Sequence, residues 1–147
     1  KMLTQLSVYM TDRLIGIDFG LSKVGLSISD PLKIISIPLK VIKYKKREEL
    51  LSKLQEIAME NDVKSFVIGY PLNMNNKKNE MTKLVDDFFE ELKNLNFNVF
   101  LQDERLSSES AKKIMHEQNI KTGKNKEHID LIASTIILQS FLDKGSF

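Results

Sequence analysis

Four acidic residues stand where they could form one site, although they lie far apart along the chain. Asp18 falls near the end of an apolar run at residues 13–19, and Asp103 and Glu104 directly follow another run at residues 98–102. If both runs are strands of an open α/β sheet, these acids lie at the carboxyl ends of the strands, where such sheets bind ligands. A turn or capping carboxylate is the alternative for each acid alone, but acids at the ends of both strands favour a shared site.

The fourth acid, Asp130, is the more informative one. It lies in the sequence IDLIASTIILQSFL at residues 129–142, which leaves little room for a solvated helix face. A helix that is apolar nearly all round is expected to be buried, and a buried carboxylate is costly unless it is paired or binds a metal. The alternative is that Asp130, near the start of the helix, merely favours the positive end of the helix dipole.

This set of side chains favours metal-assisted phosphodiester hydrolysis. Clustered carboxylates repel one another without a cation, and carboxylate oxygens suit Mg²⁺ or Mn²⁺. Two such ions about 4 Å apart can activate a water and stabilise the leaving oxygen. The predicted catalytic and metal-binding residues are therefore the same four: Asp18, Asp103, Glu104 and Asp130.

Composition excludes several other classes of chemistry. There is no cysteine, so disulfides and thiolate chemistry are absent, and His116 and His128 have no cysteine partners for a structural zinc site. No serine has a histidine base in a recognisable arrangement for acyl transfer. The net charge of +2 is only mildly basic, so the position of the charges matters more than their sum. No apolar run approaches the roughly 20 residues that span a bilayer, and we expect a cytoplasmic protein with no membrane association.

The order of apolar patterns predicts an α/β fold in one domain at residues 13–143. The lysine before Met2 indicates that residues 1–12 are an added extension outside this domain. Three strands in succession followed by βα units give a five-stranded mixed sheet, with the first three strands antiparallel and helices on both faces. Pro38 places the third strand at an edge or at a bulge. The predicted strands are 13–19, 24–30, 34–42, 65–69 and 98–102, and the predicted helices are 46–61, 79–95, 107–118 and 127–143.

Four segments together resemble the motifs of the YqgF/RuvX family, in the same order. They are GIDFG at 16–20 with VGL at 24–26 and SDP at 29–31, IGYPLNM at 68–74, DERLS at 103–107, and IDLIA at 129–133. GIDFG alone would be a weak signal, whereas four motifs spread from residue 16 to residue 133 are specific.

The resemblance implies an RNase H-like fold related to RuvC resolvases, and a bacterial nuclease that processes the 5′ end of pre-16S ribosomal RNA. The family also carries an older description as Holliday junction resolvases. The four acids match the family's acidic cluster, although the sequence leaves open which of Asp103 and Glu104 reaches the metal. Two departures from the family pattern are the Ser22-Lys23 pair and Asn75-Asn76, which replaces the usual Asp-Gly; asparagine tolerates the positive φ of such a turn.

Basic residues near these segments are candidates for binding phosphates. Lys121, Lys124 and Lys126 precede Asp130, and a separate run at residues 40–47 is interpreted as solvated surface. Arg105 contacts the scissile phosphate or pairs with a neighbouring acid, and Tyr70 stacks on a base or packs in its loop. The residues predicted to bind nucleic acid are Lys23, Asn73, Lys77, Lys78, Arg105, Lys124 and Lys126.

The sequence leaves alternatives for the class of protein, the substrate and the oligomeric state. A kinase-like ATPase shares a motif similar to GIDFG, but it needs two lobes and this chain supplies one domain. A non-catalytic RNA-binding module would keep the fold without the activity. The partner is an RNA precursor or a branched DNA, and the protein is a monomer or a homodimer, because junction resolution needs paired active sites.

Overall fold

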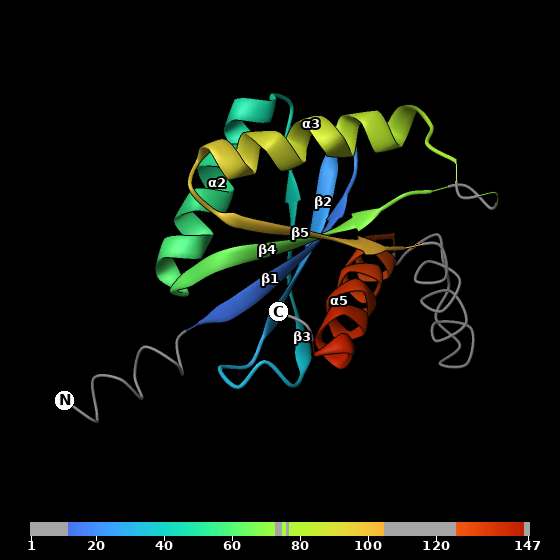
Figure 1. The fold of residues 1–147 in the computed structure, drawn as a ribbon. Helices are drawn as coiled ribbons and strands as arrows, with labels where there is room; N and C mark the ends of the chain where they lie inside the picture. Colours follow the sequence, from blue (N-terminus) through green and yellow to red (C-terminus); the bar gives the residue numbers. More distant parts are fainter. Residues whose placement is uncertain (1–11, 73–74, 76, 105–125, 146–147) are drawn as a thin grey trace.

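A five-stranded mixed sheet forms the centre of the protein, as the sequence predicts. The computed structural model describes residues 12–72, 75, 77–104 and 126–145 (Figure 1). The sheet order is β3-β2-β1-β4-β5. The pairs β1–β2 and β2–β3 are antiparallel, while β4 and β5 run parallel to β1. The strands are β1 Arg13–Phe19, β2 Lys23–Ser29, β3 Ser36–Lys43, β4 Val63–Tyr70 and β5 Asn98–Asp103.

The edge strand β3 contains Pro38, as the sequence analysis predicts. The register between β2 and β3 shifts between Leu26 and Ser27, and Pro38 stands opposite Ser27. Proline cannot donate to a ladder hydrogen bond, so it is tolerated at an edge or a bulge, and here it has both. The shift places Lys43 directly opposite Lys23 at the far end of the pair.

Helices cover both faces of the sheet. Helices α2 (Arg47–Glu60) and α3 (Glu80–Asn94) lie on one face, and α5 (Lys126–Lys144) lies on the other (Figure 1). Asn79 caps α3, accepting a hydrogen bond from Thr82 N at 3.1 Å while its own N–H donates to Thr82 Oγ1 at 2.7 Å. The helix predicted at residues 107–118 lies outside the described residues.

Alternation along β1 divides the core into two clusters. Ile15, Ile17 and Phe19 pack in the larger cluster, beneath α2 and α3. Leu14 packs in the smaller cluster against Ile137, Leu138 and other residues of α5. Since successive strand residues point to opposite faces, Gly16 and Asp18 share the α5 face with Leu14.

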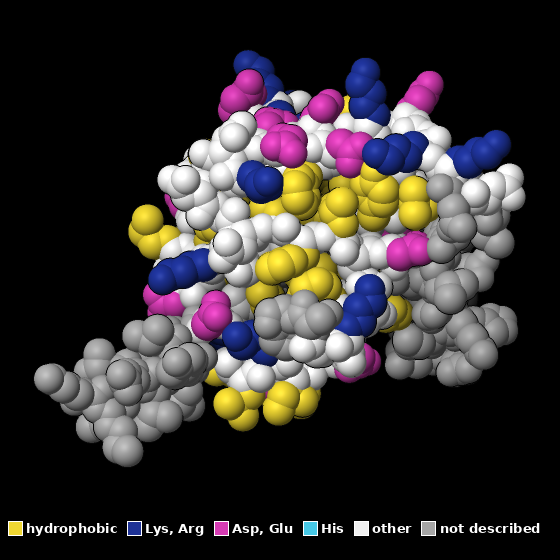
Figure 2. All heavy atoms as spheres, viewed as in Figure 1, with side chains coloured by type: hydrophobic (Ala, Val, Ile, Leu, Met, Phe, Trp, Pro, Cys, Tyr) yellow, Lys and Arg dark blue, Asp and Glu magenta, His cyan; other side chains and the backbone are white. Residues whose placement is uncertain are grey.

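The face in Figure 2 carries mixed charge, and an exposed apolar group lies at its lower edge. Figure 2 shows acidic and basic side chains interspersed along α3, and a group of hydrophobic side chains at the lower edge of the molecule. The exposed apolar residues there are Leu32, Ile34, Ile35 and Ile37, on the loop between β2 and β3 and the start of β3. None of the helices in the described part of the chain could span a bilayer.

Candidate active site

Asp18 and Glu104 lie on the same face of the sheet. In β5, Phe100 packs against Phe141 of α5, with ring centroids 5.1 Å apart, so the even-numbered residues of β5 face α5. Glu104 directly follows the strand and continues this alternation, and its N–H donates to Tyr70 O at 3.2 Å. Asp103 has the opposite parity, and its side chain is exposed. The structure therefore brings Glu104 rather than Asp103 beside Asp18, a point that the sequence analysis leaves open.

Two glycines beside Asp18 create the space for the other acids. Gly25 of β2 stands directly opposite Asp18, and Gly69 of β4 lies one residue beyond the paired Ile17 and Ile68. A Cβ on Gly25 would lie 2.4 Å from the backbone oxygen of Asp130, and a Cβ on Gly69 would lie 2.5 Å from Glu104 Oε2. Asp18 is thus flanked by two glycines, and Asp130 lies over one of them while Glu104 lies over the other.

Buried hydroxyl groups fix α5 one turn after Asp130. Ser27 Oγ donates to Ser134 O at 2.8 Å, and Ser134 Oγ donates to Gly16 O at 2.9 Å. Both serines are fully buried. These bonds tie α5 to β1 and β2 at once and hold the backbone of Asp130 against Gly25.

The acid cluster is electrostatically strained in the absence of a cation. Burial is the largest cause that raises the pKa of Asp18, to about 8, and the charges of Glu104 and Asp130 add to the rise. Lys23 opposes it. Burial also raises the pKa of Glu104, as does the charge of Asp103, although a side-chain hydrogen bond with Asp18 lowers it. At neutral pH the arrangement favours a proton on Asp18.

Asp130 is partly neutralised by a lysine from the neighbouring strand. Lys23 Nζ lies 2.9 Å from Asp130 Oδ2, and both side chains are partly buried. The ion pair holds this buried carboxylate oxygen directly against a positive charge. A buried carboxylate is unfavourable unless a cation lies beside it, and Lys23 supplies that cation here.

Some of the other predicted residues lie in the described part of the chain, and the rest lie outside it. Lys77 and Lys78 are exposed, and Lys78 Nζ lies 3.7 Å from Asp86 Oδ2. Tyr70 packs against the larger core cluster, and its hydroxyl donates to Asp86 at 3.2 Å, which fits the packing interpretation. Asn73, Arg105 and Lys124 lie outside the described residues, as does the side chain of Lys126 at the start of α5.

The donor set suits a hard divalent cation. Asp18, Glu104 and Asp130 offer carboxylate oxygens, and the raised pKa of Asp18 marks a place where added positive charge would be favourable. Within the described ranges, no three acidic or histidine side chains converge closely enough to enclose an ion as they stand. Asp18 instead lies between the other two acids.

The sequence analysis missed the glycines and serines that build this site. An isolated glycine inside a strand pattern marks a close backbone approach, so Gly25 within VGLSIS carried a usable signal. Ser134 carried none, because a serine on an apolar helix is explained only by the strands that it contacts.

The sheet order, the helix α5 across the face of β1, and acids at the ends of β1 and β5 define an RNase H-like domain. A family model described as RuvX: Holliday junction resolvase matches residues 12–144. The chain belongs to this family, as the sequence motifs predict. Two similar relatives are each named "Putative pre-16S rRNA nuclease". The protein of Ruminiclostridium cellulolyticum is 39% identical over 134 residues, covering 90% of this chain and 94% of the relative. The protein of Mycoplasmopsis synoviae is 40% identical over 133 residues, covering 89% and 97%.

Solved structures support the fold alone, because their sequences are distant. The resolvase of Fowlpox virus, determined in complex with Holliday junction DNA, is 10% identical with a TM-score of 0.57, covering 92% of this chain and 99% of the resolvase. The large terminase nuclease of phage G20c, determined with bound zinc, is 15% identical with a TM-score of 0.55, covering 88% of this chain and 80% of the nuclease. The predicted RNase H-like fold is confirmed.

Proposed function

We propose that this protein is a divalent-metal-dependent nuclease that cleaves phosphodiester bonds in the precursor of 16S ribosomal RNA. The observation that carries the proposal is the position of Asp18 between Glu104 and Asp130 on one face of the sheet, with the pKa of Asp18 raised to about 8. Such a cluster is unfavourable in a purely structural role, because its members repel one another. The same cluster becomes favourable when it binds a cation.

In this proposal Asp18, Glu104 and Asp130 hold the metal, and Asp103 stays a predicted additional ligand. A bound divalent cation would supply an activated water and stabilise charge on the leaving oxygen. The chain itself contributes rigid placement. Ser27 and Ser134 fix the backbone of Asp130, and Lys23 restrains its carboxylate.

The identity of the metal follows from the ligand chemistry. Carboxylate oxygens without cysteine favour Mg²⁺ or Mn²⁺ over softer metals, and neither histidine is among the proposed ligands. We therefore expect activity with Mg²⁺ or Mn²⁺, and its loss in EDTA.

The substrate proposal rests on the relatives named above, which the chain covers almost completely. Four-way DNA junctions are the second candidate, because the matching family model is described as a resolvase. Resolution needs two active sites on one junction, so that candidate requires a homodimer, whereas cleavage of single-stranded RNA is open to a monomer.

Cleavage of two labelled substrates tests these proposals together. One is a single-stranded RNA that spans the 5′ processing site of pre-16S RNA, and the other is a synthetic four-way DNA junction. We expect the wild type to cut the RNA with Mg²⁺ or Mn²⁺ and not with EDTA, and Asp18→Asn and Asp130→Asn to be inactive. Cutting of the junction alone would transfer the proposal to the second candidate. A folded protein that cuts neither substrate would be a binding module.

A further inference from the structure

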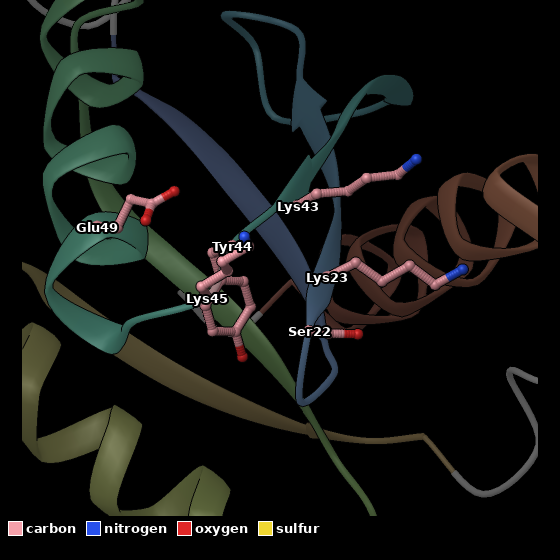
Figure 3. A pocket seen from close by; sticks show the side chains of 6 residues that line it. All are labelled: Ser22, Lys23, Lys43, Tyr44, Lys45 and Glu49. Atoms are coloured by element: carbon pink, nitrogen blue, oxygen red, sulfur yellow. The ribbon is translucent and has the colours of Figure 1, made fainter.

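A pocket beside the acid cluster is lined by three lysines. Its volume is 620 Å³, and it lies where β2 begins and β3 ends (Figure 3). The residues that line it carry three ammonium groups and one carboxylate, and that carboxylate, on Glu49, lies 3.6 Å from Lys53 Nζ. The lining residues are Ser22, Lys23, Lys43, Tyr44, Lys45 and Glu49.

The register of the sheet forces two of these lysines together. Lys23 and Lys43 stand directly opposite each other on β2 and β3. Figure 3 shows their side chains extending in the same direction, toward the side of the sheet that α5 covers, with Ser22 beside them. Like charges directly opposite on neighbouring strands destabilise a sheet. Asp130 offsets the charge of Lys23, and Lys43 and Lys45 bring two further positive charges to the lining.

The pocket wall is held by hydrogen bonds to the turn that follows Asp18. Tyr44 is buried, its N–H donates to Ser22 O at 3.0 Å, and its hydroxyl donates to Gly20 O. Gly20 fits tightly there, since a Cβ on it would lie 2.5 Å from Lys23 O. The positions of the lysine backbones are therefore fixed relative to the acid cluster before any ligand binds.

Lys23 belongs to both sites. It lines the pocket and pairs with Asp130, so an anion in the pocket would lie next to the residues that hold the metal in the proposed function. A strand of nucleic acid offers anions in a row, and lysines are general phosphate binders.

Resting on the proposed nuclease function, we propose that this pocket binds a non-scissile phosphate of the substrate strand, through Lys43, Lys45 and Ser22 together with Lys23. The phosphate is an internal phosphodiester or a terminal 5′-phosphate, which share the same recognition chemistry. The pocket would thereby set where the strand lies relative to the acids.

The test is the salt dependence of RNA binding, measured by fluorescence anisotropy on the uncleaving Asp18→Asn protein. Lys43→Gln and Lys45→Gln are each added to this background. Lys40→Gln is the matched control, because Lys40 is exposed on the same strand. It stands opposite Leu26, whose side chain lies in the larger core cluster, so Lys40 belongs to the face of the sheet that Lys43 does not share. Circular dichroism confirms that each variant is folded.

Loss of one phosphate contact should weaken binding about fivefold and reduce the slope of log K against log salt by about 0.7. We expect this for Lys43→Gln and Lys45→Gln and not for Lys40→Gln. RNA binding with equal slopes in all three variants, or no RNA binding at all, overturns the pocket assignment. RNA binding with the expected slopes, but no cleavage by the wild type, leaves the pocket standing and removes the proposed nuclease function.

Two versions of the RNA distinguish the source of the phosphate. If the Lys43→Gln effect is equal with 5′-phosphate and 5′-hydroxyl strands, the pocket takes an internal phosphodiester. If the effect occurs only with the 5′-phosphorylated strand, the pocket reads a terminal phosphate.

Discussion

Replacing Asp18 with asparagine is expected to stabilise the metal-free domain at neutral pH, although it removes a residue of the active site. Burial and the neighbouring acids raise the pKa of Asp18 from 3.8 to about 8 in the folded state. Between these two values the folded state holds a proton that the unfolded state has lost, so the free energy of unfolding falls as the pH rises. Asparagine does not ionise, and its amide can still donate a hydrogen bond to Glu104.

The magnitude follows from the size of the shift. A rise of about four pKa units corresponds to about 5 kcal/mol of stability that is fully present below pH 4 and lost as the pH passes 8. The Asp18 side chain keeps partial contact with water, which screens these charges. We therefore expect Asp18→Asn to gain roughly 2–3 kcal/mol over the wild type at pH 8, and almost nothing at pH 4.

Urea unfolding in EDTA at pH 4, 6 and 8 measures this difference. Asp87→Asn is the control, because Asp87 is exposed on α3, away from the cluster. Adding Mg²⁺ should stabilise the wild type by about 2.7 kcal/mol at a hundredfold excess over the dissociation constant, and should not stabilise Asp18→Asn. A stability difference that does not vary with pH, or a loss of stability in Asp18→Asn at pH 8, would refute the electrostatic argument.

Four further substitutions probe how the fold around the site is built. Gly25→Ala places a methyl group 2.4 Å from a backbone oxygen, so chemical denaturation should show a loss of about 2–3 kcal/mol, with reduced cleavage. A methyl group on Gly69 would meet side-chain atoms of Glu104 and Ile137 rather than backbone, so Gly69→Ala should cost about 1 kcal/mol. A Gly25→Ala protein as stable as the wild type would contradict the close approach of α5. Ser134→Ala removes a buried hydrogen bond to β1 and should lower the free energy of unfolding by about 1–3 kcal/mol; an unchanged value would mean that this bond does not hold α5. Arg47→Gln should cost about 1–2 kcal/mol, because Arg47 lies over two aromatic rings at 5.3 and 5.6 Å; a change in the salt slope of RNA binding in this variant would contradict its structural role.

Local sequence patterns were enough to predict the sheet and the acids, because both depend on features within a few residues. The run at residues 13–19 is β1 with the predicted bounds, and Pro38 marks the edge strand. The sequence also allows a choice between Asp103 and Glu104 as the residue beside Asp18. Once Phe100 is assigned to the buried face, alternation places Glu104 with it and Asp103 opposite.

Other features depend on contacts between distant segments, which no local pattern reveals. The sequence pattern favours a solvated surface for residues 40–47, yet Arg47 packs on aromatic rings and pairs with Glu91, while Lys43 and Lys45 line a pocket. Their roles differ because strand register and helix packing separate them. The roles of Asn73, Arg105 and Lys124 stay predictions.

The most direct test of the account is the single-turnover rate of RNA cleavage in Mg²⁺ by variants that remove one charge at a time. Asp18→Asn, Glu104→Gln and Asp130→Asn should each lower the rate at least about a hundredfold, with the fold intact. Asp103→Asn, on the exposed side of the strand, should lower it less. If Asp103→Asn abolishes cleavage while Glu104→Gln cleaves at the wild-type rate, the arrangement of acids described here is not the one that performs the reaction.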